Sequence, residues 1–517
     1  MTRRHWTRRE LLVGGGGVLA GLGCLGAAGI VGYAWPRSPA PAPAPTPGPS
    51  SASAAGQIPA PGAVHSYVTR SDLRPPVLSV GLSGNAPGVP AYVLLGNKAY
   101  LGPPVGQPGL LIARRDGEIA WFNPVTDRQQ VMNFNVQSYK GKPVLTWWSG
   151  IIGGAFGRGT CYISDSSYSM IATVKAGHGL MADMHEFNLT EQGTALITAY
   201  RQRSADLSAV GGKTSGAVWS GVVQEIDIAT GDVVFQWDSL DHVPVTETRQ
   251  PLVGGTPDRP FDYFHINSVA VAPDGDLLVS ARDTWTVYKI GRHDGKIAWR
   301  LGGAKSDFTI GAGARFYWQH HARAHGTGLL TVFDNGSSPA HEPQSRGLLL
   351  RLDTAARRVT LVQAYTHPAG LLADNQGSMQ LLPGNRAFVG WGAEPYFTEF
   401  DADGSVLLGG QLPVGDQSYR AFTADWAGHP TDRPAVVVKT NPAKGSAVYV
   451  SWNGATEVAT WRVHAGKNDS SLSTVATQPR TGFETVIAAN STGPYFAVTA
   501  HDSAGKLLGQ SATAKAT

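Results

Sequence analysis

Short runs of alternating apolar and polar residues fill the chain from about residue 62 to residue 427. Alternation with a period of two is typical of a β-strand with one buried face. Many of these runs come in pairs around an Asp-x-Gly or x-Thr-Gly turn, which predicts β-hairpins. Copies of this hairpin pattern lie at residues 111–121, 223–234, 287–299, 348–361 and 398–407.

A second kind of strand, opened by a glycine, recurs between the hairpins. Its copies begin at Gly193, Gly275, Gly328 and Gly384, which lie 82, 53 and 56 residues apart. Four strands per unit of roughly 40–50 residues are the signature of a β-propeller. We therefore predict a propeller over residues 62–427, with six blades as the expected number and seven as the alternative.

The pattern changes after His429 and Pro430. Short strands without the hairpin repeat follow, with Trp452 in an early strand and Tyr495 in a late one. This arrangement resembles a fibronectin type III β-sandwich, and a further propeller blade is the alternative. The predicted fold class is thus all-β, a β-propeller followed by a small β-sandwich over residues 428–517.

The first 35 residues have the pattern of a targeting segment. Arg8 and Arg9 precede an apolar, glycine-rich stretch that extends to Trp35, as in a twin-arginine export signal. Residues 36–61 are rich in Pro and Ala and predict an extended linker. The apolar stretch is long enough to span a bilayer, which needs roughly 20 residues, so signal cleavage and membrane anchoring both stay open. We expect an extracellular or cell-surface protein that is a monomer.

Composition narrows the classes of function. Five arginines and one glutamate lie in residues 1–38, and taking them from the totals of 42 basic and 38 acidic residues leaves 37 of each sign. A neutral remainder gives no electrostatic reason to bind nucleic acid. Cys24 lies in the leader and only Cys161 remains, so no internal disulfide and no cysteine metal cluster are expected. No P-loop is present, which disfavours a nucleotide-dependent enzyme.

Histidine recurs at one phase of the predicted repeat. His185, His265 and His320 stand eight, ten and eight residues before the glycine that opens the second strand of their unit. The innermost strand of each blade lines the channel of a propeller, so these three side chains are expected to surround one channel. Imidazole serves as nucleophile, as general acid or base, or as metal ligand. The nearby carboxylates Asp183 and Asp262 would allow a mixed metal site, but no metal-binding spacing supports one, and we predict no metal and no cofactor.

Three further residues are candidates for the site. Arg346 could clamp a sulfate or phosphate group because guanidinium binds such oxygens in pairs. Asn267 could donate to an anion, and His367 lies on a predicted loop between blades. A structural role is the alternative for each of them.

The histidine-bearing segments resemble the arylsulfotransferase (arylsulfate sulfotransferase) family. The resemblance covers roughly residues 70 to 425 and is greatest for the exported actinobacterial and fungal branch with a C-terminal sandwich. The segments that carry it are residues 183–198, 264–269, 319–336 and 377–385.

The resemblance implies a six-bladed propeller that moves a sulfuryl group from an aryl sulfate to a phenolic acceptor through a sulfohistidine, without phosphoadenylyl sulfate. It implies that His265 and His320 are channel histidines and that Arg346 binds sulfate. Residues 375–380 of the next unit contain no histidine, so His320, His265 or His367 would take the part of the nucleophile. The alternatives are a non-catalytic binding propeller and a metal-dependent hydrolase on the same ring of histidines.

Overall fold

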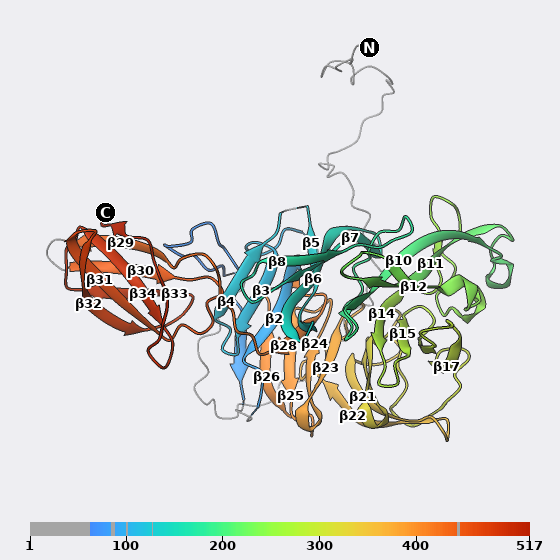
Figure 1. Ribbon diagram of the computed structural model, residues 1–517. Coiled ribbons are helices and arrows are strands. Elements are labelled where there is room, and N and C mark those ends of the chain that lie inside the picture. The colour runs from blue at the N-terminus through green and yellow to red at the C-terminus, as the bar shows by residue number, and fades with distance from the viewer. Residues whose placement is uncertain (1–62, 84–87, 100–101, 127, 442–444) are drawn as a thin grey trace, which may run out of the picture.

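A computed structural model describes residues 63–83, 88–99, 102–126, 128–441 and 445–517 of the chain. The predicted leader, linker and Cys24 lie outside these residues. Six sheets form the larger part of the described molecule, and each is built around four antiparallel strands that lie side by side (Figure 1). Each of these sheets contacts the next one along the chain, and the sixth contacts the first, so that the six sheets close into a ring. The described chain is therefore a six-bladed β-propeller, which confirms the predicted fold class.

The first three blades hold the longest strands. Blade 1 comprises β28 (Ala421–Ala424), β2 (Tyr92–Ala99), β3 (Gly109–Arg114) and β4 (Ile119–Pro124); blade 2 comprises β5 (Gln130–Tyr139), β6 (Lys142–Gly153), β7 (Phe156–Ser164) and β8 (Met170–Val174); blade 3 comprises β9 (Phe187–Leu189), β10 (Thr194–Ala205), β11 (Gly216–Asp227) and β12 (Val233–Asp238). Since β28 comes from the end of the propeller and pairs with β2 from its start, blade 1 closes the ring.

The last three blades follow the predicted repeat. Blade 4 comprises β14 (Ile266–Val271), β15 (Leu277–Ala281), β16 (Thr286–Ile290) and β17 (Ile297–Gly302); blade 5 comprises β19 (His320–His325), β20 (Leu329–Asp334), β21 (Arg346–Asp353) and β22 (Arg358–Thr366); blade 6 comprises β23 (Ser378–Leu382), β24 (Arg386–Gly390), β25 (Tyr396–Phe400) and β26 (Val406–Gln411). The predicted hairpin turns hold glycines such as Gly117 (φ 89°) and Gly404 (φ 88°), in a left-handed conformation that favours glycine.

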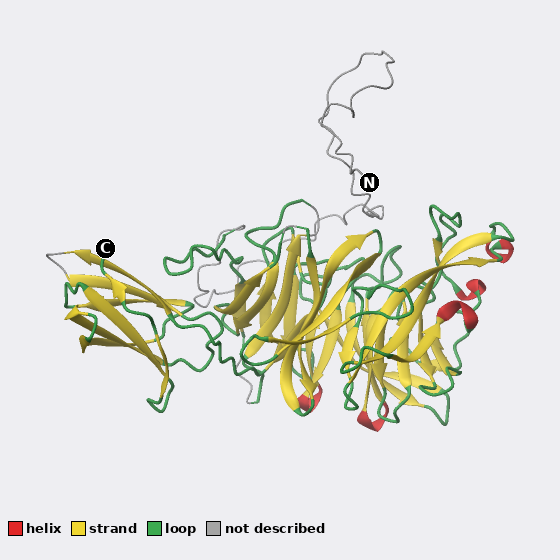
Figure 2. Ribbon diagram, turned by 45° about the horizontal axis from the view of Figure 1, so that its top comes forward, coloured by secondary structure: helices red, strands yellow, loops and turns green. Residues whose placement is uncertain are grey.

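Short elements complete the propeller. The strands β1 (Ser79–Leu82), β13 (Phe261–Asp262), β18 (Thr309–Ile310) and β27 (Asp416–Gln417) add to β26, β11, β22 and β2, and the 3₁₀ turns are η1 (Ser208–Val210), η2 (Ser239–Asp241), η3 (Val245–Glu247), η4 (Gly326–Gly328) and η5 (Pro383–Asn385). These turns are the only helical elements of the described chain, as Figure 2 shows. Over the described residues, no helix has the length and apolar character needed to cross a membrane.

A small β-sandwich follows the propeller and carries the C-terminus (Figure 1). One sheet comprises β29 (Ala435–Asn441), β30 (Gly445–Ser451) and β33 (Glu484–Ala489), and the other comprises β31 (Thr460–Asn468), β32 (Ser471–Pro479), β34 (Tyr495–His501), β35 (Leu507–Gln510) and β36 (Ala514–Lys515). Trp461, Val448 and Phe496 are buried between the two sheets. The sandwich is thus confirmed, whereas its likeness to a fibronectin type III domain stays a prediction.

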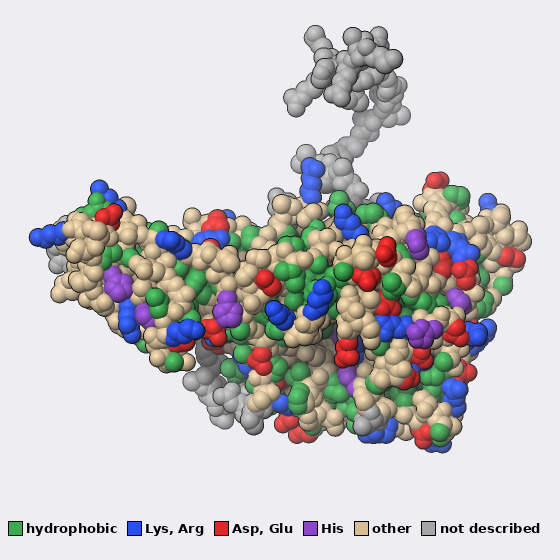
Figure 3. All heavy atoms as spheres, viewed as in Figure 1, with side chains coloured by type: hydrophobic (Ala, Val, Ile, Leu, Met, Phe, Trp, Pro, Cys, Tyr) green, Lys and Arg blue, Asp and Glu red, His purple; other side chains and the backbone are tan. Residues whose placement is uncertain are grey.

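The sandwich docks against β4, the outer strand of blade 1. The side chain of Asn453 bonds both backbone groups of Phe122, donating through Nδ2 at 2.9 Å and accepting at Oδ1 at 3.0 Å. Glu118 Oε1 accepts from the backbone N–H of Phe483 at 2.6 Å. These contacts hold the sandwich at the rim of the propeller, away from the channel. Charges of both signs are mixed over the face of the molecule drawn in Figure 3, in keeping with the balanced sequence.

Candidate active site

The three predicted channel histidines lie at the starts of three inner strands. His185 lies two residues before β9, His265 one residue before β14, and His320 is the first residue of β19. Their exposed fractions are only 2%, 8% and 1%. The ring centroids of His185 and His265 are 4.9 Å apart, with one ring edge-on to the other. The repeat phase therefore brings at least two imidazoles into direct contact at one end of the channel.

A β-bulge places the His265 side chain. His265 has a left-handed backbone (φ 50°), and the pairing of β14 with β15 shifts register between Ile266 and Ser268. Such a conformation costs a non-glycine residue on the order of 1–3 kcal/mol. The Asp262 side chain holds it, because Oδ1 accepts from the His265 backbone N–H at 3.1 Å. The bulge and the hydrogen bond with Asp262 together fix the direction in which the His265 side chain points at the end of the channel.

Each of the two histidines is backed by an aspartate. His185 Nδ1 lies 2.5 Å from Asp183 Oδ2, and His265 Nδ1 lies 2.7 Å from Asp262 Oδ2. A carboxylate can only accept, so both Nδ1 atoms carry the proton and both Nε2 atoms are left for chemistry. Among the described residues, no protein group forms a hydrogen bond with either Nε2 atom. This is the arrangement in which imidazole acts as nucleophile or as general acid and base.

The two pKa values move in opposite directions. Burial lowers the pKa of His185, and Asp183 only partly offsets that effect. Burial also acts to lower the pKa of His265, but Asp262 and Asp283 together outweigh it and raise the pKa. Near pH 7 His185 is therefore neutral, while His265 holds a proton more readily than a free histidine. Neighbouring groups with opposite shifts are typical of an acid paired with a base or nucleophile.

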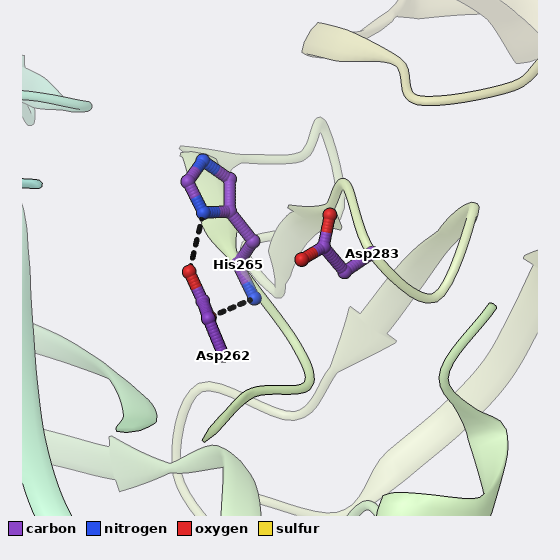
Figure 4. A group of neighbouring side chains, drawn as sticks. All are labelled: Asp262, His265 and Asp283. Atoms are coloured by element: carbon purple, nitrogen blue, oxygen red, sulfur yellow. Dashed lines mark hydrogen bonds and ion pairs between the residues drawn. The ribbon is translucent and has the colours of Figure 1, made fainter. Parts of the chain in front are cut away.

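Asp262, His265 and Asp283 form a compact group (Figure 4). One potential ligand atom from each lies within 4.8 Å of the others, so the donor set could hold a divalent cation. Asp262 already accepts from His265, and Asp283 Oδ1 lies 2.8 Å from Arg282 Nη1. A metal ion would have to compete with these two cationic donors. The group is better matched to holding a charged imidazole than to ligating a metal.

Arg282 is the cationic side chain of this end of the channel. It lies one residue after β15, is 3% exposed, and places its guanidinium 4.7 Å from the centroid of the Trp318 ring. Its Nη2 donates to the backbone oxygen of Asp374 at 3.2 Å, and its charge adds to the effect of burial in lowering the pKa of His320. Arg282 is a residue of this region that the repeat of histidines did not indicate. The sequence did contain a signal for Arg282. In each blade, antiparallel pairing places the end of the second strand beside the start of the inner strand, as in the pair of Ala281 and Ile266, so a residue just after Ala281 lies at the same end of the channel as His265.

His320 lies near the pair but both of its nitrogens have partners. Nδ1 lies 2.7 Å from Asn335 Oδ1, and Nε2 accepts from the backbone N–H of Gln376 at 3.3 Å. Burial is the main reason why its pKa is well below the usual value. A neutral His320 therefore links blade 5 to the loop that enters blade 6. It borders the site rather than presenting a reactive nitrogen to it.

The other predicted site residues have structural partners in the described chain. Arg346 bonds Asp334 at 2.6 Å and Glu342 at 3.0 Å, and it shows no contact with the three histidines. Asn267 donates to the backbone oxygen of Gln319 at 2.6 Å. The His367 ring is edge-on to Trp391 and tilted against Tyr396, with ring centroids 5.4 and 4.8 Å away. The structure thus gathers His185, His265 and His320, whereas Arg346 and His367 show no contact with them among the described residues.

Aromatic side chains flank the histidine pair. The Tyr200 ring is 6.2 Å from His185 and 6.3 Å from His265, and it stacks on Phe156 at 4.4 Å. Trp219 meets the edge of Phe156 at 4.8 Å. These residues come from the long strands β7, β10 and β11, which extend beyond their blades (Figure 1). They form an apolar wall against which an aromatic ring can stack.

An ionic layer closes the channel beneath the pair. Glu186 is bonded by Arg420 at 2.8 Å and by Arg323 at 2.7 Å, and both Glu186 and Arg420 are 1% exposed. Arg420 also donates to the backbone oxygens of His185 and Asn267, each at 2.9 Å. The layer therefore supports the backbone of the site from below. Arg323 and Arg420 lie 137 and 234 residues from Glu186 in sequence, so local sequence patterns did not indicate this ionic layer.

Comparison with known proteins places the chain in a family. The family model described as Arylsulfotransferase (ASST) matches residues 135–411, more than half of the chain and all three channel histidines. The chain belongs to the arylsulfotransferase family, as the motifs predicted. No curated protein matches it.

Solved structures are similar only at a distance. A protein of unknown function from Bacteroides caccae is 13% identical with a TM-score of 0.39, covering 64% of this chain and 98% of that one. A streptogramin B lyase is 9% identical with a TM-score of 0.33, and the match covers 72% of this chain and 94% of the lyase. The virginiamycin B lyase of Staphylococcus aureus with quinupristin is 9% identical with a TM-score of 0.27, covering 73% and 94%.

Proposed function

We propose that this protein transfers a sulfuryl group from an aryl sulfate to a phenol, with His185 as nucleophile and His265 as general acid and base. One observation carries the assignment. Two imidazoles in contact, each fixed by an aspartate at Nδ1, have pKa values shifted in opposite directions within the region matched by the arylsulfotransferase model.

The first half of the reaction consumes the aryl sulfate. The lone pair on Nε2 of neutral His185 attacks sulfur, the N–S bond forms, and the bond between sulfur and the phenolic oxygen breaks. Protonated His265 gives its Nε2 proton to the departing phenolate. Asp183 stabilises the positive charge that develops on His185, and Arg282 balances the charge of the sulfuryl oxygens.

The second half reverses the roles. Neutral His265 takes the proton of an acceptor phenol, whose oxygen attacks the sulfur held on His185. The O–S bond forms, the N–S bond breaks, and His265 is left protonated for the next turnover. Donor and acceptor use the same aromatic wall of Phe156, Tyr200 and Trp219 in succession, which suits a ping-pong scheme.

We further propose that the protein works outside the cytoplasm as a monomer. The paired arginines Arg8 and Arg9, the apolar stretch after them and the Pro- and Ala-rich segment 36–61 support export by the twin-arginine route, with the anchored and cleaved forms both compatible. The sandwich docked on blade 1 leaves the channel clear, which supports a role in contacts outside the active site.

The test measures release of 4-nitrophenolate from 4-nitrophenyl sulfate, with and without phenol. Release that needs phenol and persists with a chelator supports the proposal, and His185→Gln and His265→Gln should each abolish it. His429→Gln is the matched control, because His429 is exposed on the sandwich side and pairs only with Glu457. Unchanged transfer in both channel variants contradicts the assignment.

One other function, metal-dependent hydrolysis, would require the compact group of Asp262, His265 and Asp283 to hold a cation. That function predicts release that is independent of phenol and lost with a chelator. A chain that releases nothing from any aryl sulfate would instead fit a binding propeller.

A further inference from the structure

A cavity lies on the other side of the ionic layer from the histidine pair. Its volume is about 180 Å³, room for about six water molecules. It runs along the inner strands β5, β9, β19, β23 and β28. The lining residues near the starts of the strands, such as Asn133 and His321, are buried, while later ones such as Gln137 and His325 are partly exposed. The cavity therefore opens at the end of the channel opposite to the histidine pair.

The walls of this lower cavity carry a net positive charge. Arg323 and Arg420 line it together with one carboxylate, Glu186. Burial and the neighbouring arginines hold the pKa of His321 well below its usual value and lower that of His325 to about 4, so both are neutral at pH 7. The lining residues thus hold one cationic charge in excess.

A buried donor and a buried acceptor in the lower cavity have no protein partner. Arg420 Nε and Asn133 Oδ1 are both inaccessible and unpaired, and their residues are 2% and 4% exposed. The orientation of the Asn133 amide is fixed, because Nδ2 donates to the backbone oxygen of Met184 at 2.7 Å. Asn135 adds a further amide, whose Oδ1 already accepts from Val136. A buried polar group without a partner is unfavourable, so a ligand that forms hydrogen bonds with both atoms is favoured.

We propose that the lower cavity binds a small oxyanion that carries a proton, of the class of inorganic phosphate. The arginines bind its charged oxygens, and its P–O–H group donates to Asn133 Oδ1. Sulfate carries no proton at neutral pH and would set a lone pair against that oxygen, so the cavity discriminates between two ions of the same shape. Binding here is separate from the sulfuryl transfer proposed above and does not depend on it.

The test is isothermal titration calorimetry of the full chain at pH 7 and constant ionic strength, with inorganic phosphate, sulfate and chloride as probes. Phosphate should bind, and sulfate should bind at least about tenfold more weakly, because it leaves Asn133 unpaired. Absence of phosphate binding, or equal binding of sulfate, overturns the proposal. This comparison uses the unaltered chain, so it stands even where a variant fails to fold.

A pair of variants locates the site. Asn135→Asp keeps the size of the side chain and adds a negative charge to the lining, so it should weaken phosphate binding at least about tenfold. Asn468→Asp makes the same change at an exposed position of the sandwich and should leave binding unchanged. Equal affinity of the two variants would place the phosphate elsewhere and overturn the assignment.

Discussion

Replacing Glu186 by glutamine should be among the most destabilising single changes in the channel. It removes the one carboxylate between Arg323 and Arg420 and leaves two guanidinium groups side by side. At about 4 Å and an effective dielectric constant of about 20, one pair of opposite charges contributes about 4 kcal/mol. Breaking a buried ion pair from one side costs about 3–5 kcal/mol, which is the loss expected in the free energy of unfolding.

A double-mutant cycle separates this electrostatic effect from general loss of packing. Arg420→Gln alone should also cost about 3–5 kcal/mol, because the backbone oxygens of His185 and Asn267 lose their donor. Glu186→Gln with Arg420→Gln keeps the charge of the layer at plus one, so the double variant should be destabilised by at least about 2 kcal/mol less than the sum of the single variants.

Denaturant unfolding followed by tryptophan fluorescence measures these free energies. The control is the same cycle at the exposed pair Arg70 and Asp72, whose side chains are 28% and 62% exposed and whose coupling should be at most about 1 kcal/mol. Additive effects of the Glu186 and Arg420 changes, within about 0.5 kcal/mol, would refute the account of a coupled ionic layer.

Three further predictions concern the proposed transfer. The ratio kcat/KM should fall as the pH drops through the lowered pKa of His185, because His185 must be neutral to attack sulfur. It should also fall as the pH rises through the raised pKa of His265, because His265 must be protonated to act as the acid. A pH profile without the fall at alkaline pH contradicts the role of His265. Arg282→Gln should lower kcat/KM about 10²–10³-fold, whereas Arg346→Gln should leave it near the parent value. Steady-state rates in the reverse order would show that Arg346, and not Arg282, binds the sulfuryl oxygens. Phe156→Ala should raise KM for aryl sulfates about two- to tenfold by removing a stacking surface, and an unchanged KM would show that the ring binds elsewhere.

The fold was predictable because every blade repeats one local pattern. Alternating residues around turns such as that at Gly117 specify hairpins without reference to the rest of the chain, and repetition then sets the ring. The phase of His185 and His265 in that repeat was enough to bring them to one end of the channel. The position in the repeat alone did not distinguish His320 from these two histidines, although both of its nitrogens form hydrogen bonds, with Asn335 and with the backbone of Gln376.

The charged partners were not predictable from local patterns. Arg346 has the residue type of an anion clamp, yet Asp334 and Glu342 pair with it, and it is the charge of Arg282 that acts on His265 and His320. Likewise Glu186 meets Arg420 across 234 residues of sequence. Alternation fixes which face of a strand is buried, but only the closed ring decides which side chains from different blades meet.

Trapping of the sulfated intermediate shows whether His185 accepts the sulfuryl group. The chain is mixed with 4-nitrophenyl sulfate in the absence of any phenolic acceptor, and nitrophenolate release and peptide masses are followed together. We expect a burst of nitrophenolate stoichiometric with protein, a sulfated peptide that contains His185, and loss of that modification when phenol is added. Steady release without a modified peptide, or a sulfuryl group found on His320 or His265, would contradict it.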